Sequence, residues 1–276
     1  MSGQLAIRIF WLPKAGNQEH EYEDACWPVR SLLTARPAIY CAVADGATET
    51  SFSGLWARQL VQRYGAGELA AENLLEALAP EQSRWLETVQ RRPLPWYAEE
   101  KVRSGAFAAL LGVQFEQAAE AAVRWSALAV GDCNLVQVRE NGLLCSFPAA
   151  GSDFFTSRPV LISSNSARNS AVAEHLQTAM GMGVAGDRFY LMTDALAQWF
   201  LGETEAGRFP WQSVDQIAAT RGRRAFIAWI EQLREQGALR NDDVTLVRVE
   251  LLPQQPVSAH THEAGERQGA PKDVDG

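Results

Sequence analysis

The feature that most constrains this chain is a repeated pattern in which a strand-like apolar run stands next to a carboxylate. The runs "CAVADG", "SALAVGD" and "FYLMTD" end at Asp45, Asp132 and Asp194, and "NDDVTLVRV" carries Asp242 just before its apolar part. Taken alone, Asp45 followed by Gly46 reads as an ordinary turn, because both residue types favour turns. If several of these strands belong to one packed β core, however, their acidic ends can converge.

Convergent carboxylates would have a chemical use. They repel one another and raise one another's pKa, and divalent cations relieve this repulsion. The acidic loop at residues 16–25 adds Glu23 and Asp24 to the set. Oxygen ligands without His or Cys suit hard ions such as Mg²⁺ or Mn²⁺, and two such ions about 3.5–4 Å apart form a known device for phosphoester hydrolysis. The residues alone favour a two-metal hydrolase, while the reading of each Asp as a turn or cap stays open.

The rest of the chain mixes strands and helices without a Pro/Gly/Ser-rich linker, so residues 1–252 are predicted to form one domain. Residues 253–276 lack large apolar side chains apart from valines and are predicted to be a disordered tail. The expected strand-rich runs lie at residues 5–11, 38–44, 105–115, 124–141, 142–148, 187–192 and 242–252, with a hairpin at Asn141-Gly142. The expected helices lie at residues 53–64, 68–78, 80–90, 195–202, 212–219 and 223–236, the first with Ser53 as its N-cap.

Composition and charge exclude several classes of protein. The formal net charge is −8, which argues against nucleic acid or an anionic membrane as the main partner. No apolar run approaches the ~20 residues of a membrane span, and the N-terminus has no signal-peptide pattern. None of the 4 cysteines lies in a CxxC pair, so a zinc site has little support. A cytoplasmic location is therefore predicted.

The order of the acidic motifs resembles a known family. "YEDA" at 22–25, "VADGATE" at 43–49, "ALAVGDCNLVQVRENG" at 127–142, "DRFYLMTDALAQWF" at 187–200 and "NDDVTLVRV" at 241–249 together are similar to the motifs of the type 2C metal-dependent serine/threonine protein phosphatases. The resemblance implies an α+β fold, a four-layer α-β-β-α sandwich. In it two antiparallel sheets lie face to face, helices cover them, and the metal ions bind at one end.

The resemblance also implies roles for individual residues. Asp45 would bridge two metal ions and the Gly46 carbonyl would bind one of them. Asp194 and Asp242 would hold the other ion, and Asp132 together with Asp194 would form a weaker third site. The catalytic set would be Asp45, Asp194 and Asp242, with Mg²⁺ or Mn²⁺ as cofactor.

The acidic loop completes this implied set. Glu23 would support the second ion, directly or through water, with Asp24 beside it. The implied partners are a phosphorylated protein as substrate and a cognate serine/threonine kinase.

The chain departs from the family pattern around these carboxylates. Ala47 and Thr48 replace the residues that follow Asp-Gly in the family, so neither the second Gly nor a general-acid His is present. Glu19 stands where many members have a phosphate-binding Arg, and Lys14 and His20 are the cations nearby in sequence. These departures indicate a divergent, bacterial-style member with unusual substrate recognition.

Three functional hypotheses remain at the level of sequence. The first is a phosphoprotein phosphatase, favoured because every metal carboxylate is present. The second is a catalytically weak module that keeps the fold and binds a phosphorylated partner or a kinase. The third is a two-metal hydrolase of a nucleotide or another small phosphoester. The loop at residues 146–164 is either a flap beside the active site or a packed surface excursion.

Overall fold

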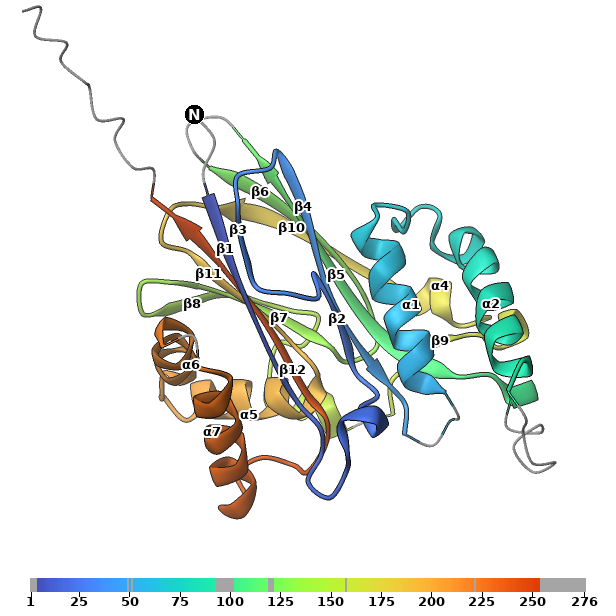
Figure 1. The fold of residues 1–276 in the computed structure, drawn as a ribbon. Coiled ribbons are helices and arrows are strands. Elements are labelled where there is room, and N and C mark those ends of the chain that lie inside the picture. The colour runs from blue at the N-terminus through green and yellow to red at the C-terminus, as the bar shows by residue number, and fades with distance from the viewer. Residues whose placement is uncertain are drawn as a thin grey trace, which may run out of the picture.

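Two antiparallel β-sheets packed face to face form the centre of the computed structural model (Figure 1), which describes residues 4–48, 50, 52–92, 102–118, 122–156, 158–220 and 222–253. The sheet that contains β1, here the β1 sheet, has the order β3-β1-β12-β11-β7-β8, and the β4 sheet has the order β10-β6-β5-β4-β2, with β9 paired to β5. The β1 sheet comprises β3 (Leu32–Thr34), β1 (Gln4–Leu12), β12 (Val244–Leu252), β11 (Arg188–Met192), β7 (Asn134–Arg139) and β8 (Gly142–Phe147). The β4 sheet comprises β10 (Gln177–Gly183), β6 (Val123–Val130), β5 (Phe107–Gln117), β4 (Ala38–Gly46), β2 (Ala25–Trp27) and β9 (Ile162–Ser163).

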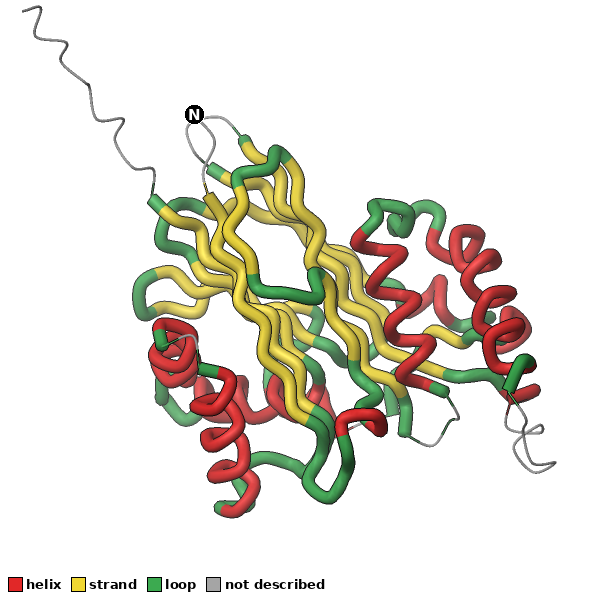
Figure 2. Tube along the Cα trace, in the orientation of Figure 1, coloured by secondary structure: helices red, strands yellow, loops and turns green. Residues whose placement is uncertain are grey.

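Helices cover the outer face of each sheet, as the red segments on both sides of the yellow strands show (Figure 2). The β4 sheet carries α1 (Ser53–Gly65), α2 (Leu74–Gln90) and the short α4 (Val172–His175). The β1 sheet carries α5 (Asp194–Glu205), α6 (Pro210–Ala219) and α7 (Arg223–Glu235). Three 3₁₀ turns, η1 (Glu19–Glu21), η3 (Ser152–Thr156) and η4 (Ser166–Arg168), lie in the connections. The predicted α-β-β-α sandwich is confirmed.

Alternation of side chains along the strands separates the core into layers. In β1, Ile7 faces the opposite sheet, where it shares a buried cluster with Val43 of β4, whereas Phe10 packs into the cluster beneath the helices of its own sheet. This follows from the period of two in a strand, since both faces of each sheet are covered. Trp56 and Trp85 fill the helix layer over the β4 sheet.

Two expectations about helices are wrong. Residues 68–90 do not form two helices separated at Pro80; α2 is one helix that begins at Leu74 and contains Pro80. Its buried residues Leu78, Glu81 and Trp85 keep one stripe across the proline, and the burial of that stripe outweighs the backbone hydrogen bond that Pro80 removes.

Ser53 is not the N-cap of α1. It is the first helical residue, and Phe52 precedes it in the left-handed conformation with φ 62°. The Ser53 hydroxyl donates to the Glu23 carboxylate instead. A contact with the acidic loop therefore takes the place of the expected helix cap.

The remaining expectations have different outcomes. The predicted hairpin at Asn141-Gly142 is confirmed, since β7 and β8 pair with Arg139 opposite Gly142. Within the described part of the chain, no helix is both long and apolar enough to cross a membrane. Most of the predicted tail, residues 254–276, lies outside the described residues.

Candidate functional site

The register of the β4 sheet brings two of the acidic positions to one end of the sandwich. Asp45 lies opposite Ala109 of β5, and Val130, the last residue of β6, lies opposite Leu110 of the same strand. The turn that carries Asp132 begins directly after Val130. The ends of β4 and β6 are therefore neighbours across β5.

The β1 sheet brings two more carboxylates to this end. Met192, the last residue of β11, pairs with Asn134, the first residue of β7, which follows the turn at Asp132. Asp194 comes two residues after Met192, and Asp242 comes two residues before β12, whose start pairs with the end of β11. The sheet registers thus place all four strand-end carboxylates at the same end of the molecule.

The raised pKa values of Asp45 and Asp132 follow from burial and from the neighbouring carboxylates. Burial raises the pKa of Asp45 well above its usual range, and the charges of Asp24, Asp194, Asp132 and Asp242 raise it further. Burial and the charge of Asp194 raise the pKa of Asp132 to about 7. We call Asp24, Asp45, Asp132, Asp194 and Asp242 the carboxylate cluster.

Asp24 is the most deeply buried member of the cluster. The residue is only 1% exposed. Its Oδ2 accepts a hydrogen bond from the Thr245 hydroxyl at 2.7 Å. Its Oδ1 is also buried and has no hydrogen-bond partner among the described residues. Burial and the charge of Asp243 raise the pKa of Asp24. An unpaired buried carboxylate oxygen is costly unless a proton or a cation compensates it.

Glu23 is held against the end of β4 by close packing. Its Oε1 accepts from the Ser53 hydroxyl at 2.5 Å, and its backbone N–H donates to Asp243 Oδ2 at 2.6 Å. A Cβ on Gly46 would lie 2.7 Å from the Glu23 carbonyl oxygen, and one on Gly54 would lie 3.0 Å from the Glu23 Cα. Both glycines therefore make room for the acidic loop beside β4.

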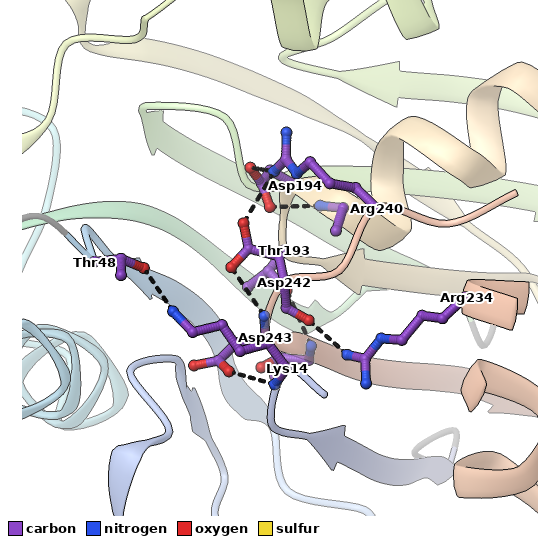
Figure 3. Close-up of polar contacts among 10 residues, drawn as sticks. Lys14, Thr48, Thr193, Asp194, Arg234, Arg240, Asp242 and Asp243 are labelled. Carbon is purple, nitrogen blue, oxygen red and sulfur yellow. Dashed lines mark hydrogen bonds and ion pairs between the residues drawn. The ribbon is translucent and has the colours of Figure 1, made fainter. Parts of the chain in front are cut away.

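Sequence reasoning missed one cation of this site, Arg240. Its guanidinium forms an ion pair with Asp194 Oδ2 and lies 3.4 Å from Asp242 Oδ2 (Figure 3). It thus bridges the two carboxylates that the family resemblance assigns to one metal ion. The signal was the Arg two residues before Asp242 in "LRNDD", which no family motif includes.

The three positions considered for phosphate binding have different surroundings. Glu19 forms an ion pair with Arg223 at 2.9 Å. The Lys14 Nζ donates to the Thr48 hydroxyl at 3.4 Å, just beyond the end of β4 (Figure 3). His20 is exposed. Lys14 therefore reaches the rim of the site, whereas Glu19 is engaged with helix α7.

The chemistry of the cluster fits divalent cations. Its donors are carboxylate oxygens, which hard cations prefer, and the buried Asp24 Oδ1 has no hydrogen-bond partner among the described residues. Among the residues that the structure describes, no three His, Cys, Asp or Glu side chains are grouped closely enough to hold a metal ion as they stand. In this arrangement Asp194 is engaged by Arg240.

The loop after β8 packs against α5 in its described part. Phe155 is buried in the hydrophobic core beneath α5. The Ser152 backbone N–H donates to Glu205 Oε1 at 2.7 Å. This packing favours the packed surface excursion over the flap for η3.

Comparison with known proteins shows the fold. No protein-family model matches the chain, and no curated protein matches it. The chain is similar to the solved Mycobacterium tuberculosis serine/threonine phosphatase PstP, at 16% identity and a TM-score of 0.56, covering 91% of this chain and 100% of that chain. The catalytic domain of PstP in complex with two manganese ions gives 15% identity and a TM-score of 0.54, covering 90% and 100%.

A third solved structure, a bacterial serine phosphatase, gives 10% identity and a TM-score of 0.53, covering 91% of this chain and 99% of that chain. The chain thus has the fold of bacterial serine/threonine phosphatases. The resemblance to type 2C phosphatases expected from the motifs is confirmed at the level of the fold.

Proposed function

We propose that this chain is a divergent type 2C-like, metal-dependent phosphoprotein phosphatase that hydrolyses phosphoserine or phosphothreonine. The observation that carries the proposal is the convergence of the carboxylate cluster at one end of a sandwich with a phosphatase fold. A scaffold alone has no need to crowd buried carboxylates, because their mutual repulsion is destabilising.

Two Mg²⁺ or Mn²⁺ ions are the cofactors that this proposal requires, in keeping with the two manganese ions of the PstP complex. Asp45 would be shared by the two ions and the Gly46 carbonyl would bind one of them, with Glu23 and Asp24 in support. Asp194 and Asp242 would hold the other, and Asp132 with Asp194 a third. Bound ions of this type activate water and neutralise phosphate charge.

The chain's own residues set the surroundings of the reaction. Asp243 fixes the backbone of the acidic loop, since its two oxygens accept from the Lys14 and Glu23 N–H groups at 2.8 and 2.6 Å. Because Ala47 carries no titratable group, protonation of the leaving alkoxide would fall to water. The proposed substrate is a phosphorylated protein, and a serine/threonine kinase would be the opposing enzyme.

A second candidate function is a catalytically weak module that binds a phosphorylated partner. One observation favours it, namely that Arg240 already neutralises Asp194 and Asp242. An internal cation of this kind could replace a metal ion and leave a stable, inactive fold.

Metal binding and turnover, measured on the same purified protein, separate the two. We expect Mn²⁺ binding by calorimetry and Mn²⁺- or Mg²⁺-dependent hydrolysis of a phosphothreonine peptide and an aryl phosphate. Asp45→Asn and Asp194→Asn should each reduce turnover by at least about 10²-fold, whereas Glu203→Gln, in the remote ion pair with Arg208, should not. Absence of Mn²⁺ binding rejects the phosphatase, and binding without turnover of any phosphoester supports the module.

A further inference from the structure

Arg240 is placed where its guanidinium can serve either of two anionic partners. Its side chain is 42% exposed, while that of Asp194 is 13% exposed and that of Asp242 is 35% exposed. The guanidinium is therefore partly exposed to solvent while it contacts Asp194 and Asp242 (Figure 3).

The backbone that follows Arg240 is held by contacts of the next two residues. Asn241 exchanges two hydrogen bonds with the Ala15 backbone, its Oδ1 accepting at 2.7 Å and its Nδ2 donating at 3.3 Å. The Asp242 carbonyl accepts from Arg234 Nη2 at 2.5 Å. Because the main chain is fixed, a change at this site would involve rotation of the Arg240 side chain and not movement of the loop.

Divalent cations and the Arg240 guanidinium compete for the same oxygens. Asp194 Oδ2 and Asp242 Oδ2 are the atoms that Arg240 contacts, and a divalent ion bound to these carboxylates would repel a guanidinium only a few ångströms away. A metal ion must therefore displace Arg240, and the displaced side chain remains tethered at the edge of the cluster.

A displaced guanidinium beside bound cations has a suitable ligand in the phosphate of a substrate. Arginine binds phosphate through two parallel N–H donors, a geometry that lysine cannot offer. Such a donor is missing at Glu19, whose carboxylate pairs with Arg223 instead.

We propose that Arg240 is the phosphate-binding residue of this site, and that it exchanges Asp194 and Asp242 for the substrate phosphate when divalent cations occupy the cluster. This inference rests on the proposed function. It assigns to one side chain both the counter-charge of the metal-free cluster and the recognition of the phosphomonoester.

Two binding measurements on the full chain test the exchange without relying on turnover. Calorimetry with Mn²⁺ should give about tenfold tighter binding for Arg240→Gln than for the wild type, because the competing cation is gone. Inorganic phosphate, titrated into protein saturated with Mg²⁺, should bind about tenfold more weakly to Arg240→Gln. Arg240→Lys should keep the Mn²⁺ affinity near that of the wild type and lose part of the phosphate affinity. Arg208→Gln, which removes an arginine from a remote exposed ion pair, should change neither.

Several outcomes overturn the inference. One is an unchanged or weaker Mn²⁺ affinity in Arg240→Gln, which would make Arg240 a bystander or a support for the metal ligands. Another is loss of phosphate binding in Lys14→Gln and not in Arg240→Gln, which would assign phosphate to the lysine at Thr48. Turnover of a phosphothreonine peptide is scored separately. Both affinity shifts without turnover support the role of Arg240 and reject the phosphatase, whereas turnover without the shifts supports the phosphatase and rejects the role of Arg240.

Discussion

The buried carboxylate of Asp243 accepts a hydrogen bond from the backbone N–H of Glu23 at 2.6 Å, although 220 residues separate the two in sequence. Its other oxygen accepts from the Lys14 N–H at 2.8 Å. Asp243 thus joins the start of β12 to two points of the loop between β1 and β2. Asp243 is therefore a structural support of the acidic loop.

Substitution of Asp243 should lower the stability of the protein, and the loss should increase with the number of acceptor oxygens removed. Asp243→Asn keeps one acceptor oxygen and leaves one N–H unpaired, so we expect the free energy of unfolding to fall by about 1–2 kcal/mol. Asp243→Ala loses both acceptors and should cost about 2–4 kcal/mol. Urea denaturation measures both, with the exposed Glu87→Gln of α2 as control. Equal effects of Asn and Ala would show that charge, and not the number of acceptors, is what matters.

The sequence predicted the scaffold of the site better than its contacts. The apolar runs ending at Asp45 and Asp194 were sufficient to predict strands, and the sandwich was implied by the family resemblance that the motifs carry. The role of Arg240 was not predicted, because an ion pair between residues distant in sequence leaves no periodic pattern in the sequence. Ser53 donates a hydrogen bond to Glu23 and does not cap α1. This contact joins segments that are distant in sequence, so local helix propensity cannot predict it.

Gly46 should tolerate no side chain, because the atoms around it are mostly backbone. A Cβ there would lie 2.7 Å from the Glu23 carbonyl oxygen and 2.8 Å from the Ser53 carbonyl carbon. We expect Gly46→Ala to lower the free energy of unfolding by about 1–3 kcal/mol and to weaken Mn²⁺ binding by displacing Glu23. Gly142→Ala is the matched control, since its Cβ would meet nothing closer than 3.7 Å. Similar stabilities of the two variants would contradict the close packing at Gly46.

The raised pKa of Asp132 predicts how the stability of the folded protein changes with pH in the absence of divalent cations. Its pKa is about 7 in the folded protein, mainly because of burial and the charge of Asp194, and about 3.9 in the unfolded chain. Between these values the folded state binds more protons, so this group's contribution to stability is present at low pH and is lost as pH rises toward 7.

Asp132→Asn isolates this contribution, because asparagine does not titrate. In chelator, the stability of Asp132→Asn relative to the wild type should increase steadily from about pH 4 to about pH 7 and then level off. Urea denaturation at several pH values measures the difference between the two proteins, which cancels the carboxylates elsewhere whose pKa values are lowered, such as Asp187. A relative stability that does not change with pH would contradict a raised pKa at Asp132.

Arg234 should act on the site through the backbone of Asp242. Its Nη2 donates to the Asp242 carbonyl at 2.5 Å and its Nη1 donates to the Pro13 carbonyl at 3.0 Å, so one guanidinium ties the loop before β12 to the end of β1 (Figure 3). Arg234→Ala should lower the free energy of unfolding by about 1–3 kcal/mol and weaken Mn²⁺ binding severalfold, whereas Arg234→Lys, which can keep one of the two hydrogen bonds, should be intermediate in both. Arg224→Ala, an exposed residue of the same helix, is the control. Calorimetry with Mn²⁺ and urea denaturation measure the two effects, and a loss of stability without any loss of Mn²⁺ affinity would mean that Asp242 does not depend on Arg234 for its position.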